Sequence, residues 1–474
     1  MRKFFLACIL FVTASGIHAQ QDTWDLRRCV EYAVSNNISV KQADVQARVS
    51  ALQTKLAIAE AYPSLSFGTN AGLNFGRSVD PTTNQYTTNS VFFQSFNVNA
   101  GITLFNFSRI KNDQKAAITN QEANNTNLNA ARNNISLNVA ASYLNYVLSI
   151  ETANAAKVQI QQTTSQLNNT RKLVDAGSMP ELNAAQLEAQ LATDSSTYIT
   201  AQGTAEQNRI ALMGMLNLDA SVSFQVSVPD VDKIPLEPLA EMQPDYVYRL
   251  ALSTQPLQKY DSLKIVASQY TIKSARGAMY PTLSFFGQLG SNFASTFREF
   301  SSFPVTDTIS KLHIGGTDYF VSVPGQGTII TKPSYFRQVG NINFTQAFGI
   351  QLNVPIANNR QLKNNFEQSK LTLENLKLIQ QQDNLTLQTN IYQAYSSSVS
   401  AMEKFNATTK AYQIDEYAFE LSRKRYEIGV LSTIDYITTQ NNLFKARIDQ
   451  LSARYDYVFK MKILEFYKGQ GVKL

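Results

Sequence analysis

Two stretches of about seventy residues contain neither proline nor glycine, and they constrain the fold more than any other feature. They run from Asn106 to Ala176 and from Asn358 to Ile428. At 1.5 Å per residue, an α-helix of that length spans about 105 Å. Such a helix is too long to be buried inside a compact domain, so it must pack along neighbouring helices. The second stretch has apolar residues at the seven-residue spacing of coiled coils, at Leu371, Leu378, Leu385, Tyr392 and Val399.

The sequence also repeats itself once. Three segments of the first half return in the second half in the same order. The pairs are Ala61–Phe67 with Met279–Phe285, Gly101–Leu104 with Gly349–Leu352, and Arg171–Gly177 with Arg423–Gly429. The offset grows from 218 residues for the first pair to 248 for the second, which places an insertion within residues 294–340. Because only two units exist, the pattern indicates a duplicated fold and not a solenoid.

Four segments alternate between apolar and small polar residues with a period of two, which is typical of β-strands. They lie at about residues 62–76, 91–105, 280–293 and 341–356. Only Phe286 interrupts the alternation of the third segment. Strands with one apolar and one small-polar face fit transmembrane strands between lipid and a lumen. A soluble sheet with one wet face would show the same alternation.

Each half therefore predicts a helix, two strands and a long helical hairpin. The first repeat covers residues 20–228 and the second covers 246–474, with a proline-rich connection at 229–245. The amphipathic stretch from Trp24 to Ala61 predicts one continuous first helix that ends before Pro63. The two insertions between paired strands, at 77–90 and 294–340, are expected to be loops.

The hairpins are expected to turn at two glycines. Gly177 and Gly429 fit the position just after a helix end, where glycine is favoured. The segments Ser178–Glu181 and Ser432–Asp435 each predict a capping box at the start of the returning helix. The returning helices are expected to run to about Leu216 and Tyr467.

Residues 1–19 predict a secretory signal peptide. Arg2 and Lys3 precede an apolar run from Phe4 to Thr13, and a small residue, Ala19, offers the cleavage site. The apolar run is too short to cross a bilayer. We therefore expect the mature chain to begin near Gln20.

The mature composition argues against several classes of protein. One cysteine, Cys29, and one histidine, His313, remain after cleavage, so no intramolecular disulfide can form. The sequence has no phosphate-binding loop and no distinctive pair of carboxylates. We therefore expect that the protein is not an enzyme and that it binds no cofactor and no metal. The mature net charge of +4, from 40 basic and 36 acidic residues, is too small to indicate nucleic-acid binding.

Four strands cannot close a transmembrane barrel, because the smallest such barrels have about eight. Unpaired strand edges in lipid cost several kcal/mol for each backbone group. Copies of the chain must therefore pool their strands. Two copies would give a barrel filled by side chains, and three would leave room for a conduit. The strand number alone leaves both open.

Taken together, the chain resembles the outer-membrane efflux protein family, the TolC type. The resemblance rests on the duplicated unit, on Tyr-Pro-x-Leu-x-Phe at residues 62–67 and 280–285, and on the glycine-centred tips. It implies a mainly α fold with a β-barrel part, formed by a homotrimer in the lipid of the outer membrane with helices in the periplasm. It also implies a periplasmic adaptor that docks at the helical tips and an inner-membrane efflux pump.

The resemblance places a periplasmic entrance at the second tip. It implies Tyr426 and Asp435 as entrance or gate residues, and Asn183 is the matching position of the first tip. The family's best-known pattern also has an arginine and a second aspartate, where this chain has Leu431 and Thr438. Asp435 could instead be a first-turn charge that favours its helix, and Tyr426 could be core packing.

Six residues are candidates for contact with the adaptor. These are Arg171, Lys172, Gly177, Arg423, Lys424 and Gly429. They could equally be solvated helix ends, where cations are favoured. Two other functions also fit the pattern: an outer-membrane duct of a type I protein secretion system, and a soluble periplasmic coiled-coil structural protein.

Overall fold

The computed structural model describes residues 23–79, 84–88, 90–229 and 234–469. The expected signal peptide and part of the proline-rich connection lie outside these residues. The chain divides into two compact units. The first consists of Met1–Ala51, Thr119–Ile265 and Glu374–Leu474, and the second of Leu52–Ile118 and Val266–Leu373.

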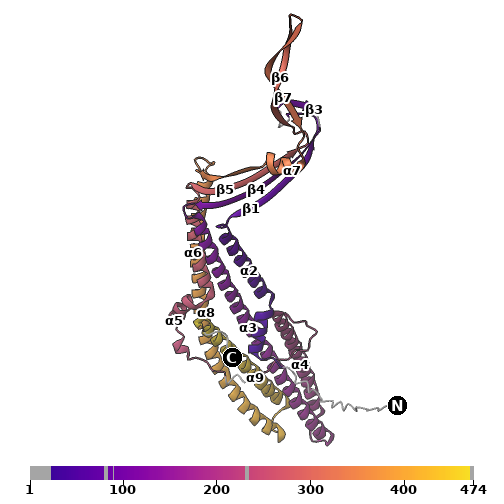
Figure 1. The fold of residues 1–474 in the computed structure, drawn as a ribbon. Coiled ribbons are helices and arrows are strands. Elements are labelled where there is room, and N and C mark those ends of the chain that lie inside the picture. The colour runs from indigo at the N-terminus through magenta and orange to yellow at the C-terminus, as the bar shows by residue number, and fades with distance from the viewer. Residues whose placement is uncertain (1–22, 80–83, 89, 230–233, 470–474) are drawn as a thin grey trace, which may run out of the picture. The chain divides into compact units, whose positions relative to one another are not determined.

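Helices make up most of the described chain (Figure 1). They are α1 (Leu26–Asn36), α2 (Ile38–Ala59), α3 (Arg109–Asp175), α4 (Glu181–Leu216), α5 (Pro244–Thr254), α6 (Pro256–Gly277), α7 (Tyr335–Arg337), α8 (Gln361–Glu427) and α9 (Thr433–Lys468), with a short 3-10 turn at Leu239–Glu241. The lengths recur between the halves: α1 and α5 have 11 residues, α2 and α6 have 22, α3 and α8 have 67, and α4 and α9 have 36.

The prediction of one continuous first helix is wrong, because Asn37 separates α1 from α2. Its backbone is extended, and its side-chain Nδ2 donates to the carbonyl of Met215 at the end of α4. Gln255 separates α5 from α6 in the same way. It precedes Pro256, and its Nε2 donates to the carbonyl of Phe466 near the end of α9. Each break therefore supplies a side-chain amide that donates to a backbone carbonyl at the end of a returning helix.

The two long helices are confirmed, although each begins a few residues later than predicted. Phe107 and Ser108 have φ of 48° and 63°, and Asn359 and Arg360 have φ of 53° and 60°. Residues other than glycine rarely adopt this left-handed backbone. These two-residue turns redirect the chain from strand to helix, so the first helical residues are Arg109 and Gln361.

A four-stranded antiparallel sheet forms in the second unit, in the order β1–β4–β5–β8 (Figure 1). The strands are β1 (Ser64–Asn74), β4 (Val91–Phe105), β5 (Thr282–Ala294) and β8 (Thr345–Asn353). Within the described chain, β1 and β8 each have a neighbour on one side only. The last strand starts later than predicted, because Gln338–Ile342 forms a π-helical turn around the buried side chain of Gln338.

Two phenylalanines on the small-polar face each cover a glycine of the neighbouring strand. Phe93 lies opposite Gly72, and a Cβ at that glycine would lie 2.9 Å from the ring. Phe286 lies opposite Gly349, where a Cβ would lie 3.1 Å from the ring. Phe286 interrupts the predicted alternation for this reason: its ring fills the space that a glycine leaves open.

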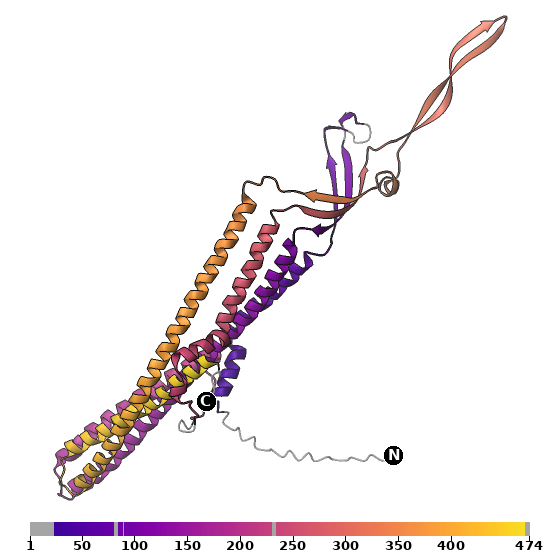
Figure 2. The same cartoon turned by 90° about the vertical axis from the view of Figure 1, so that its left-hand side faces the viewer.

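The prediction of loops between the strands is wrong, because both insertions contain β-hairpins. One pairs β2 (Arg77–Val79) with β3 (Tyr86–Thr88), and the other pairs β6 (Glu299–Ile314) with β7 (Thr317–Thr331). Figure 2 shows the second as a long twisted ribbon. Its turn consists of Gly315 and Gly316, both with positive φ. Two glycines between runs rich in β-formers are a recognised hairpin signal.

The largest apolar core lies in the first unit, among α1, α3, α4 and α9. Tyr143 is buried there, and its hydroxyl donates to the carbonyl of Ser227 at 2.6 Å. Cys29 is buried in the same core, and burial raises the pKa of its thiol to about 12. Beside this core, Val226 forms a single parallel bridge with Trp24.

Candidate entrance at the helical tips

The two tips end their long helices with the same backbone motif. Gly177 and Gly429 have φ of 72° and 75°, as predicted for residues just after a helix end. In each tip the next backbone amide donates to the carbonyl five residues earlier and closes a Schellman turn. These bonds are Ser178 N to Leu173 O at 2.8 Å and Val430 N to Arg425 O at 2.9 Å.

The helices that leave the tips start differently. At the second tip Ser432 caps α9: its Oγ accepts from the amide of Asp435 and donates to that carboxylate at 2.7 Å. The predicted N-cap at Ser432 is therefore confirmed, although Asp435 accepts from the hydroxyl of Ser432 and not from its backbone amide as in a complete capping box. As an acidic residue in the first turn, Asp435 also favours the helix start. At the first tip the predicted capping box is wrong. Ser178 belongs to the Schellman turn, and Pro180 precedes α4 without a side-chain cap.

Tyr426 joins the two hairpins at the tips. Its side chain is buried, and its ring stacks on Tyr436 with 4.7 Å between centroids. The hydroxyl lies 3.1 Å from Oγ1 of Thr433 and 3.3 Å from Oγ1 of Thr170. Because Thr170 belongs to α3, Tyr426 is both a core residue and a link from the second hairpin to the first.

A polar network, buried at Thr163, Asp194 and Gln440, joins the same hairpins further along the helices, and we call it the polar clasp. It consists of Thr163, Gln190, Asp194, Gln440 and Asn441. Thr163 Oγ1 donates to Asp194 Oδ2 at 2.6 Å and accepts from Gln440 Nε2 at 3.0 Å. Gln190 donates to the other oxygen of Asp194 at 2.7 Å. Gln190 and Asn441 also exchange two amide hydrogen bonds of 3.0 and 3.2 Å.

The polar clasp was not predicted from the sequence. Its side chains come from α3, α4 and α9, and each is ordinary among the many Asn, Gln and Thr residues of these helices. Asp194 is 5% exposed, so its carboxylate depends on its donors. Within the described residues, Oε1 of Gln440 is buried without a hydrogen-bond partner. The clasp is therefore only partly satisfied, which weakens it as a permanent core contact.

A groove of about 550 Å³ separates the two tips. It brings together three of the predicted site residues, Asn183, Tyr426 and Gly429. Asp435 is exposed and does not line this groove. The other lining residues are Ser178, Met179, Pro180, Leu182, Gln186, Val430, Leu431, Ser432, Thr433 and Ile434.

The predicted basic residues at the tips are all exposed. Arg171 forms an ion pair of 2.5 Å with Glu188, which links α3 to α4. Arg423 lies 3.9 Å from Glu427, and exposed pairs of this kind contribute little stability. Apolar side chains share the tips with these cations, and they were not predicted as site residues. The exposed ones are Leu182 (64%), Ile428 (73%), Val430 (62%) and Ile434 (59%).

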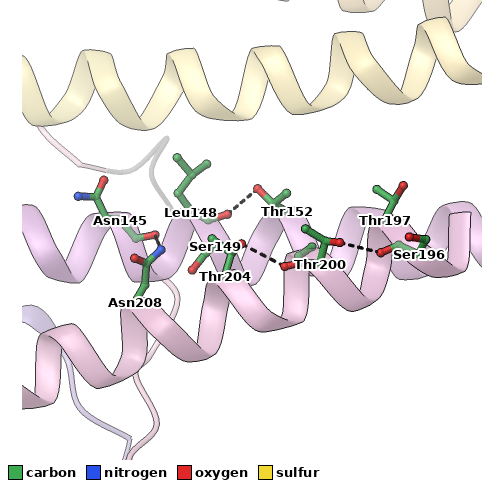
Figure 3. A pocket seen from close by; sticks show the side chains of 10 residues that line it. Asn145, Leu148, Ser149, Thr152, Ser196, Thr197, Thr200, Thr204 and Asn208 are labelled. Atoms are coloured by element: carbon green, nitrogen blue, oxygen red, sulfur yellow. Dashed lines mark hydrogen bonds between the residues drawn. The ribbon is translucent and has the colours of Figure 1, made fainter. Parts of the chain in front are cut away.

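A second groove, of about 560 Å³, lies between α3 and α4 (Figure 3). Its hydroxyls donate back to their own helices, as Thr152 does to the carbonyl of Leu148 and Thr204 to that of Thr200. The groove therefore presents few free polar groups for chemistry.

Across the described parts of the chain, no group of three or more His, Cys, Asp or Glu side chains could hold a metal ion. No helix there is long and apolar enough to cross a membrane.

Comparison with known proteins places this fold and these tips in one family. The model of the outer membrane efflux protein family matches residues 30–218 and 247–466. The chain belongs to the outer membrane efflux protein family.

Individual relatives are distant in sequence. Outer membrane efflux protein BepC of Brucella suis biovar 1 (strain 1330) is 22% identical over 90% of this chain and 81% of its own length. Toxin and drug export protein A of Aggregatibacter actinomycetemcomitans is 21% identical over 91% of this chain and 83% of its own. The crystal structure of the CmeC outer membrane channel of Campylobacter jejuni has a TM-score of 0.72 and 18% identity, covering 95% of this chain and 87% of that one.

Proposed function

We propose that this chain is the outer-membrane exit duct of a tripartite efflux system and that it passively conducts small molecules to the exterior. The observation that carries the proposal is the exposed apolar face of the four-stranded sheet. Leu65 and Phe348 are each 76% exposed, and Ile350 is 66% exposed. An apolar face of this extent suits contact with lipid.

The unpaired edges of the sheet support a homotrimer. Within the described chain, β1 and β8 carry one row of unpaired backbone groups each. In lipid these groups must find partners, so β8 of one copy pairs with β1 of the next. Three copies give a twelve-stranded barrel with an open lumen.

The helical tips are the proposed entrance and the docking site for a periplasmic adaptor, which links the duct to an inner-membrane pump. The exposed apolar side chains at the tips provide a surface that a partner would cover. Arg171, Lys172, Arg423 and Lys424 are exposed at the same tips, with Arg171 and Arg423 beside the carboxylates of Glu188 and Glu427. Gly177 and Gly429 leave open space there, because nothing lies within 4 Å of a Cβ built on either glycine.

The entrance is proposed to be gated by separation of the two hairpins. Tyr426 and the polar clasp hold them together, so opening requires these hydrogen bonds to break. Asp435 would contribute a ring of three carboxylates that favours cations. Leu431 and Thr438 add no charge to this ring. Leu431 packs against the aromatic side chains of the second tip, and Thr438 donates to the carbonyl of Ile434.

The halves of the chain are proposed to descend from one duplicated unit. The support is the recurrence of helix lengths, together with the matched breaks at Asn37 and Gln255. The residue boundaries of the repeats remain those predicted from the sequence, 20–228 and 246–474.

Export of proteins is the second candidate function. It is favoured by one relative, Toxin and drug export protein A, whose name covers both kinds of cargo. Both functions use the same fold, the same location in the outer membrane and the same entrance. Disruption of the gene followed by separate assays of drug susceptibility and of secreted proteins would distinguish them.

Cross-linking of the sheet edges tests the proposed assembly. In a Cys29→Ala background, single cysteines placed along β1, from Gly68 to Gly72, are combined with cysteines along β8 between Thr345 and Gly349. We expect oxidation in intact cells to give dimers and trimers and no larger species. The control pair is Asn70 with Ser95, which are partners within one sheet, so its disulfide should leave the mass of one chain. Monomers at every edge combination would contradict the proposal.

A further inference from the structure

Asp261 is a buried carboxyl group at a contact between α6 and α8 in the first unit. Its side chain is 5% exposed, and no donor among the described residues reaches its Oδ2. The group within hydrogen-bonding reach is another carboxyl, that of Asp383 on α8. One residue further along α6, Ser262 accepts from Nε2 of Gln380 at 3.0 Å, so the two helices are in direct contact here.

The neighbouring cations are directed away from this pair. Lys264 donates to Oδ1 of Asn120 at 3.1 Å, and Lys259 lies 3.5 Å from the carboxylate of Glu122 on α3. Neither ammonium therefore neutralises Asp261. The titratable and charged groups around the site are Asp383 on α8, Glu122 on α3, and Lys259, Tyr260 and Lys264 on α6.

We propose that Asp261 and Asp383 share one proton and that this proton joins α6 to α8. Two carboxylates in contact cannot both be ionised without strong repulsion, and a buried one is especially costly to charge. A protonated Asp261 donates a hydrogen bond to ionised Asp383, which satisfies the oxygen that otherwise has no donor. The two groups titrate as a coupled pair.

The contact is consequently sensitive to pH. Burial first, and the charge and hydrogen bond of Asp383 next, raise the pKa of Asp261 from 3.8 to about 6. Because the folded chain holds the proton more tightly than the unfolded one, the pair contributes its full stability below 3.8. That contribution is lost as the pH rises to about 6 and beyond. The inference concerns only this helix contact and does not depend on the proposed function.

The test compares thermal unfolding and infrared spectra of the full-length, detergent-purified chain with those of Asp261→Asn. We expect the wild-type midpoint to fall by about 2 °C or more between about pH 5 and pH 7, and the variant to lose this dependence. At about pH 5 the wild type should show the carbonyl band of a protonated carboxyl that the variant lacks. In Asp383→Asn the band should disappear at a lower pH, because the neighbouring charge has gone.

The matched control is Asp245→Asn, which removes an exposed carboxylate that accepts from Tyr392 of α8 and should retain the wild-type pH dependence. Equal pH profiles for wild type and Asp261→Asn, or the same infrared band in both, would overturn the proposal. So would recovery of stability at about pH 8 by calcium chloride and not by sodium chloride of equal ionic strength, since the pair would then bind a divalent cation.

Discussion

Thr163 donates its hydroxyl to Asp194 at 2.6 Å, and the same hydroxyl oxygen accepts from Gln440 of the other hairpin. One side chain therefore connects three helices of the candidate gate. The two donors to the buried carboxylate of Asp194 are Thr163 and Gln190. Loss of either one leaves a carboxylate oxygen without a hydrogen bond. The polar clasp should therefore be sensitive to small changes of hydrogen-bonding capacity.

The first prediction concerns Thr163→Val, which keeps the shape of the side chain and removes the hydroxyl. We expect a loss of about 1–3 kcal/mol of stability and a higher conductance of the resting channel, because the hairpins separate more easily. Thermal unfolding and planar-bilayer recording measure the two effects. The control is Thr193→Val, whose hydroxyl is exposed and donates to its own helix at Ala189. An unchanged resting conductance would argue against a gating role for the clasp.

The second prediction concerns Tyr426→Phe. The ring can still stack on Tyr436, while the contacts to Thr170 and Thr433 are lost. We expect a stability loss of about 0.5–1.5 kcal/mol and more frequent opening. Tyr417→Phe is the matched control, because that side chain is 66% exposed. Equal opening frequencies in the two variants would assign Tyr426 to packing alone.

The third prediction concerns the glycine tips. Replacing both Gly177 and Gly429 by leucine forces left-handed backbone on bulky residues, at a cost of about 1–2 kcal/mol each, and fills the surface proposed for docking. We expect drug resistance to fall while the chain still assembles. Gly203→Leu is the control, since that glycine lies within α4 and nothing lies within 4 Å of a Cβ built there. Unchanged resistance would remove the docking proposal.

The fourth prediction concerns the sheet. Gly72→Ala places a methyl group against the ring of Phe93 and should destabilise the fold by about 1–3 kcal/mol. Gly68→Ala, in the same strand, meets nothing within 4 Å and should be close to neutral. Urea or thermal unfolding in detergent compares them. Equal stability of the two variants would show that the ring of Phe93 does not exclude a side chain at position 72.

The sequence was most informative where local chemistry decides structure. The absence of proline and glycine predicted α3 and α8, and Gly177 and Gly429 marked their ends. The alternating segments predicted the strands of the sheet, with β4 at its observed bounds of Val91 and Phe105. These features depend on neighbours in the chain, so they can be read without knowing the tertiary contacts.

The sequence was least informative where distant residues decide. Asn37 interrupts the first helix because it reaches a carbonyl of α4, which nothing in its local sequence reveals. The polar clasp joins Thr163, Asp194 and Gln440 from three helices, so its members become exceptional only after folding. The capping box predicted at Ser178 is wrong because the backbone amide of Ser178 closes the Schellman turn at the end of α3. The β6–β7 hairpin was missed although Gly315 and Gly316 offered a local signal for its turn.

The central claim is that several copies of this chain form one conduit. The most direct measurement is the mass of the detergent-purified protein by light scattering, corrected for bound detergent, followed by planar-bilayer recording of the same fraction. The account predicts a trimer, extracted only with detergent, that passes ions across the bilayer. A monomer recovered from the soluble fraction, with no conductance, would contradict it, because the exposed strands would then not face lipid.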